Sequence, residues 1–126
     1  ATAVKDFNYT VPFSAGSIAT TAEDLITFLH QLHSGKLLKL ETLRRMGQRF
    51  YPMLGYSSQL FYGFGLMQLD SPVGVLMGHS GGITGFNSIL WHSPSDGISL
   101  ALIFNDDPSS AAGALRLHQA VLQWRK

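Results

Sequence analysis

The apolar positions of the first half of the chain follow the period of a helix. They recur at intervals of three and four residues in a stretch that contains Leu25, Ile26, Leu29 and Leu32. This spacing indicates one buried helix face. Either of two threonines can begin the helix with a capping box, because Thr20 stands three residues before Glu23 and Thr21 stands three before Asp24. Gly35 is a typical residue to end it.

From residue 62 onward the pattern is typical of β-strands interrupted by glycines. Four apolar segments predict strands, over residues 62–69, 73–77, 86–91 and 98–104. Residues 93–97 contain Pro, Asp and Gly and predict a hairpin loop between the last two strands. Short links of this kind favour an antiparallel sheet over parallel units joined by crossover helices.

The remaining segments complete an α+β arrangement. Residues 1–16 predict irregular chain, and residues 40–46 predict a second, short helix. After Pro108 a final helix is predicted, with one apolar face made by Ala114, Leu117, Val121 and Trp124. The expected order is therefore two helices, three or four antiparallel strands and a closing helix.

Composition narrows the classes of function. A chain of 126 residues has room for one domain, and 45% hydrophobic residues suit a folded core. The net charge is +1 with no basic run, which argues against a nucleic-acid partner. The absence of cysteine excludes disulfides, thiolate metal sites and a cysteine nucleophile. No segment approaches the roughly 18 apolar residues of a membrane span.

The densest chemical signal is the segment GHSGGITGF at residues 78–86. Its first five residues match the G-x-S-x-G pattern of a nucleophile elbow, in which Ser80 would attack an ester or amide carbonyl. The acid and base would then be His118 with Asp96, Asp106 or Asp107. An elbow opens directly into a helix, however, and residues 86–91 predict a strand. A phosphate-binding P-loop is excluded, because no Lys occurs between positions 39 and 126.

The segment at 78–86 also resembles the third motif, K-T-G or H-[ST]-G, of the serine β-lactamase and penicillin-binding protein superfamily. The closest likeness is to the branch of class C β-lactamases, D-alanyl-D-alanine carboxypeptidases and esterases. Three more landmarks resemble that branch in the same order. They are SIATTAEDLITF at 17–28, YGFGL at 62–66, and the strand pair at 87–105 with its loop at 93–97. The resemblance covers nearly the whole chain.

The resemblance implies that this chain is the C-terminal segment of a larger catalytic domain. No Ser stands three residues before a Lys, so the S-x-x-K motif with the nucleophile is absent, and no Y-x-N or S-x-N occurs. We therefore expect residues 1–126 to form a single partial domain of β-lactamase/transpeptidase-like fold. The parent would act on a β-lactam, a D-Ala-D-Ala-type peptide or an ester through an acyl-serine, and the isolated chain would be inactive.

Site residues follow from the same resemblance. It implies catalytic roles for His79, Ser80 and Gly82, and substrate-binding roles for Gly81, Thr84 and Asn105. The backbone N–H of Gly82 would stabilise the oxyanion beside the amide of the missing serine, and Ser80 would bind substrate or relay a proton. His79 replaces the Lys of many relatives, and an imidazole is mostly uncharged at neutral pH. Recognition of a substrate carboxylate is thereby weakened.

Several expectations concern partners and alternatives. No cofactor or metal is expected, since His30 and His33 lack an acidic third ligand nearby. The apolar strand at 98–104 is expected to pair with another chain or a second copy. The resemblance implies a periplasmic or extracellular location. The alternatives are an α/β-hydrolase fragment with Ser80 in a nucleophile elbow, and a non-catalytic binding or assembly module that retains the scaffold.

Overall fold

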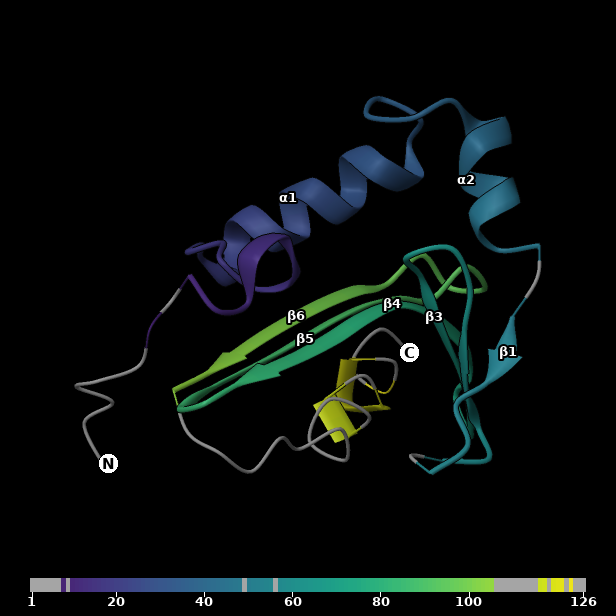
Figure 1. Cartoon of the computed structure of the whole chain (residues 1–126). Helices are drawn as coiled ribbons and strands as arrows, with labels where there is room; N and C mark the ends of the chain where they lie inside the picture. The colour runs from purple at the N-terminus through teal and green to yellow at the C-terminus, as the bar shows by residue number, and fades with distance from the viewer. Residues whose placement is uncertain are drawn as a thin grey trace.

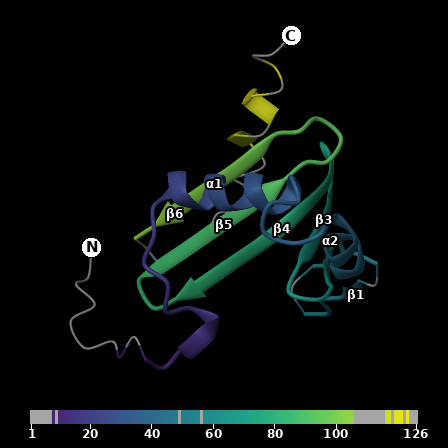
Figure 2. The same ribbon diagram turned by 90° about the horizontal axis from the view of Figure 1, so that it is seen from above.

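The computed structural model describes residues 8, 10–48, 50–55, 57–105, 116–117, 119–121 and 123. A 3-10 turn, η1 (Phe13–Ala15), precedes two helices, α1 (Ala22–His33) and α2 (Leu40–Met46). A sheet follows, and α1 lies across one of its faces (Figures 1 and 2). The predicted α+β class is confirmed, and the two helices predicted ahead of the strands are present.

All six strands form one antiparallel sheet in which each strand pairs with its neighbour in sequence. They are β1 (Tyr51–Pro52), β2 (Leu60–Tyr62), β3 (Met67–Ser71), β4 (Gly74–Ile83), β5 (Phe86–His92) and β6 (Ser99–Phe104). The sequence predicted three or four strands. Two differences matter for the site: the segment at 62–69 is divided, and the segment at 73–77 is the first half of a longer strand.

The division at 62–69 is a tight turn between β2 and β3. The N–H of Gly63 donates to the carbonyl of Leu66 at 2.7 Å, and Gly65 has φ of +68°, a left-handed conformation that favours glycine. A Cβ at Gly63 would lie 2.6 Å from the carbonyl oxygen of Met46 at the end of α2. The glycines for which the sequence predicted a strand therefore form the turn against which α2 docks.

Helix α1 begins as one of the two predicted caps requires. The Thr21 hydroxyl accepts from the N–H of Asp24 at 3.1 Å and donates to its carboxylate at 3.0 Å. The helix buries Leu29 and Leu32 and contacts β6 and β5. Helix α1 thereby covers one face of the half of the sheet that contains β5 and β6, as Figure 2 shows.

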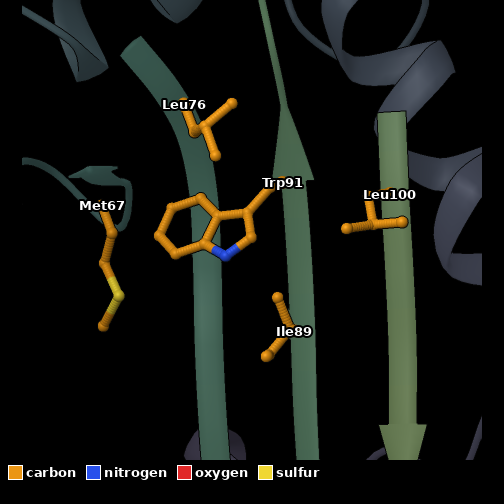
Figure 3. Packing of buried hydrophobic residues seen from close by; sticks show 5 residues of the cluster. All are labelled: Met67, Leu76, Ile89, Trp91 and Leu100. Atoms are coloured by element: carbon orange, nitrogen blue, oxygen red, sulfur yellow. The ribbon is translucent and has the colours of Figure 1, made fainter. Parts of the chain in front are cut away.

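The main core lies on the opposite face. His92 of β5 stacks on His33 of α1, so its neighbour Trp91 points away from the helix, because successive strand residues alternate. Trp91 joins a buried cluster from four strands, made with Met67, Leu76, Ile89 and Leu100 (Figure 3). The indole extends across β4, and Gly78 is its cross-strand partner.

The predicted C-terminal helix falls largely outside the described residues, Ala114 and Trp124 included. The described positions 116–117, 119–121 and 123 are helical. Figure 1 draws them on the other side of the sheet from α1. Among the described residues, no helix is both long and apolar enough to cross a membrane.

Candidate active site

The central feature of the site is a length of β4 that pairs on one side only. Strand β3 begins at Met67, which pairs with Gly78, whereas β4 continues to Ile83 and pairs there with β5. Past Gly78, no described strand pairs with the other side of β4. Residues 79–83, here called the open edge, therefore present backbone groups outward. This segment lies within the predicted motif at 78–86.

The β4–β5 turn determines which amides face outward. Only Thr84 and Gly85 separate the pair Ile83–Phe86, and Gly85 has φ of +82°. A two-residue loop makes the adjoining pair a hydrogen-bonded one, and hydrogen-bonded and non-hydrogen-bonded pairs then alternate along the ladder. Gly82 and Ser80 occupy the non-hydrogen-bonded positions. Their N–H and C=O groups therefore point away from β5, along the open edge.

The imidazole of His79 supports this assignment. Its Nδ1 lies 2.6 Å from the carbonyl oxygen of Ser80, so that carbonyl is directed outward as the register requires. Its Nε2 lies 2.9 Å from the hydroxyl of Tyr62 at the end of β2. The sequence analysis did not find Tyr62 as a site residue. Strands β2 and β3 and the turn between them place Tyr62 beside His79.

The position of Ser80 contradicts the nucleophile-elbow hypothesis. Ser80 lies inside β4 opposite Ile89, and the strand turns into β5 rather than into a helix. Its hydroxyl is part-buried and donates to the sulfur of Met67 at 3.6 Å. The carboxylate of Asp96, one candidate acid, accepts instead from the Ser93 hydroxyl at 2.8 Å and the Ile98 N–H at 2.9 Å. The other candidates, at positions 106, 107 and 118, lie outside the described residues.

Gly81 and Gly82 lie exposed on β4, with polar side chains of β5 close by. A Cβ at Gly81 would lie 3.1 Å from the Ser88 hydroxyl, and a Cβ at Gly82 would lie 2.8 Å from the amide oxygen of Asn87. Asn87 is a second site residue that the sequence analysis missed. It is the cross-strand partner of Gly82, a relation that only the register reveals.

The two predicted substrate-binding residues outside the motif lie at the same end of the sheet. Thr84 is exposed in the β4–β5 turn, and Asn105 is exposed directly after β6. Because Phe104 pairs with Asn87, strand β5 lies between Asn105 and the open edge. The structure therefore places Thr84 next to the motif and Asn105 two strands away from it.

A pair of imidazoles, His33 and His92, lies between α1 and β5, on the face of the sheet that α1 covers. The rings of His33 and His92 stack with centroids 4.0 Å apart, and Nε2 of His33 is buried without a partner among the described residues. Burial, reinforced by His92, lowers the pKa of His33 to about 4. Burial also lowers the pKa of His92, against an opposing effect of Asp96. No group of three or more His, Asp or Glu suited to a metal ion occurs in the described part of the chain.

Comparison with known proteins identifies the family of the chain. The family model described as Beta-lactamase matches residues 1–123, so the chain belongs to the beta-lactamase family of serine hydrolases. No curated protein matches.

Among solved structures, the D-amino acid amidase of Ochrobactrum anthropi SV3 complexed with D-phenylalanine is 28% identical, with a TM-score of 0.76 over 93% of this chain. Its complex with L-phenylalanine amide gives 26% identity and a TM-score of 0.81 over 95%. A D-stereospecific amidohydrolase from Streptomyces sp. is 30% identical, with a TM-score of 0.73 over 86%. The chain spans 40%, 37% and 32% of these three structures, respectively.

Proposed function

We propose that this chain is the C-terminal segment of a serine amidohydrolase that cleaves the amide of a D-amino acid through an acyl-serine. The nucleophile would come from outside the chain, and the open edge would supply the oxyanion donor. The observation that carries the proposal is the register of β4 and β5, from which the Gly82 amide is inferred to point outward on a strand with one open side. The amidases to which the chain is similar supply the substrate class.

The chemistry at this edge is electrostatic. Attack of a serine oxygen on the amide carbon places negative charge on the former carbonyl oxygen. An N–H already directed at that position stabilises the charge without rearranging, and such donors contribute about 10²- to 10³-fold each to kcat. Gly82 has no side chain to shield its amide, and it is exposed. It therefore suits the role of one of the two donors.

The state of His79 favours an amide over a substrate with a free carboxylate. Its two ring nitrogens are engaged by the Ser80 carbonyl and the Tyr62 hydroxyl. A lysine at this place would offer a fixed positive charge to a carboxylate, whereas this imidazole has no hydrogen-bonding nitrogen to spare. A site without a fixed positive charge suits a substrate that ends in a neutral carboxamide, which loses ammonia on cleavage, better than one that ends in a carboxylate.

The test uses the full-length product of the gene. We expect it to release ammonia from D-phenylalanine amide faster than from L-phenylalanine amide, and to cleave a penicillin or a D-Ala-D-Ala peptide less well. The isolated 126-residue chain, lacking the nucleophile, is expected to be inactive. Faster hydrolysis of the penicillin, the peptide or a simple ester than of any amide would contradict the proposal.

A further inference from the structure

Tyr62 and His79 form a contact that joins two separate strands at the start of the open edge. The phenol and imidazole rings meet edge to face, with centroids 5.5 Å apart and planes at 85°. The Tyr62 hydroxyl lies 2.9 Å from Nε2 of His79. Tyr62 is the last residue of β2, and His79 is the first residue of β4 beyond its pairing with β3.

The partners determine where the protons lie in the neutral ring. A backbone carbonyl only accepts, so Nδ1 of His79 must carry the proton that is donated to the Ser80 oxygen at 2.6 Å. Nε2 then holds a lone pair and accepts from the Tyr62 hydroxyl. The resulting chain runs from Tyr62 O–H to Nε2 of His79, and from Nδ1–H to the Ser80 carbonyl.

This chain of hydrogen bonds occupies one of the outward groups of the open edge. A peptide that added to β4 as an extended strand would pair with alternate residues, here Ser80 and Gly82. The imidazole already donates to the Ser80 carbonyl. Gly82 is then the outward position at which both the N–H and the C=O stay available to a substrate backbone. One such position suits a single amino acid amide.

We propose that Tyr62 is a positioning residue that holds His79 in its Nδ1–H tautomer. His79 then occupies the Ser80 carbonyl with a hydrogen bond. As a result, the open edge prefers single-residue amides over longer peptides. The preference for short substrates rests on the proposed amidase function. The positioning of His79 does not, and it is tested separately.

The first measurement is a spectroscopic one on the full-length protein labelled with ¹⁵N-histidine. We compare the wild type with Tyr62→Phe, which removes only the hydroxyl, and with Tyr51→Phe, an exposed tyrosine of β1, as the matched control. Signals of His79 are assigned by their loss in His79→Gln. We expect the wild type and Tyr51→Phe to show Nδ1 protonated and Nε2 unprotonated. In Tyr62→Phe the Nε2–H form should become populated.

The second measurement is the ratio of kcat/KM for D-phenylalanine amide to kcat/KM for a D-dipeptide amide. Removal of one hydrogen bond from the chain should lower this ratio about threefold to tenfold in Tyr62→Phe, and leave it unchanged in Tyr51→Phe. Thermal unfolding of both variants identifies any general loss of structure.

The outcomes separate the two claims. An unchanged His79 tautomer in a folded Tyr62→Phe protein overturns the positioning role. A changed tautomer with an unchanged substrate ratio overturns the preference for short amides. A changed tautomer in a protein that cleaves no amide supports the positioning of His79 and counts against the proposed amidase function.

Discussion

At the scale of single residues, the outward amide of Gly82 can be removed almost by itself. Proline lacks the N–H and is tolerated on strand edges whose N–H does not bond within the sheet. Alanine keeps the N–H but adds the same Cβ near the flexible Asn87 side chain. We expect Gly82→Pro in the full-length enzyme to have a kcat about 10²- to 10³-fold below that of Gly82→Ala.

Thermal unfolding provides the control for this comparison. Because the Gly82 amide points away from β5, the two variants should unfold at similar temperatures. A proline variant that is much less stable than the alanine variant would show that this N–H bonds to β5, and would contradict the assignment of the oxyanion donor.

Gly78 illustrates the opposite case, a glycine needed for packing. A Cβ there would overlap the carbonyl oxygen of Leu90 in the backbone of β5, next to Trp91, the cross-strand partner of Gly78. Backbone cannot move aside as a side chain does, so we expect Gly78→Ala to destabilise the fold by about 3 kcal/mol or more. Gly81→Ala, which meets only the Ser88 hydroxyl, is the control for urea unfolding. Equal stability of the two variants would contradict the packing argument.

At the scale of elements, the contact of α1 with β5 is expected to depend on pH. The folded pKa of His33, about 4, lies below the ordinary value of 6.5, because burial disfavours the charged ring. The unfolded chain then binds more protons than the native chain between these values. The contribution of neutral His33 to the free energy of unfolding is therefore complete above pH 6.5 and falls as the pH drops toward 4. His30 of α1 and Asp96 near β5 also act on the pair, through His92.

Unfolding free energies at pH 7.5 and pH 4.5 measure this effect. One pKa unit corresponds to about 1.4 kcal/mol, but His33 is only partly buried and solvent screens the charge, so we expect a loss of about 1–2 kcal/mol. The loss should be smaller in His33→Gln. In His30→Gln, which changes an exposed residue of the same helix, it should be nearly as large as in the wild type. An equal loss in all three proteins would refute the role of His33.

The elements also show how far sequence reasoning extends. Helix α1 was predictable because its cap, Thr21, and its apolar stripe are local signals. The turn at Gly63–Gly65 was not, since glycines inside an apolar run suit a strand equally well, and the choice depends on the docking of α2. Tyr62 and Asn87 escaped notice for a related reason: each acquires its place from cross-strand register, which the order of residues does not state.

At the scale of the whole molecule, the sheet ends in a strand with one unpaired side among the described residues. Strand β6 pairs only with β5 and carries the apolar sequence SLALIF. An uncovered edge of this kind recruits another strand. We propose that β6 pairs with an N-terminal strand of the parent protein, and that the isolated chain uses the same edge to pair with a second copy.

Sedimentation equilibrium of the isolated chain tests this proposal. We expect self-association that strengthens with concentration, and that weakens when Ile103, 41% exposed on β6, is replaced by Lys. Leu54→Lys, at an exposed position between β1 and β2, serves as the control. A monomer at all concentrations would contradict the pairing.

The nearest-neighbour order of the six strands has a consequence for how the parent protein folds. Each hairpin closes over a short loop, so the ladder that carries the Gly82 amide can assemble from local contacts, which form quickly. In the proposed enzyme, the oxyanion donor would therefore lie on a part of the polypeptide that can fold separately from the part that carries the nucleophile. Two co-expressed pieces, divided ahead of η1, should reconstitute a working hydrolase without a covalent link between them.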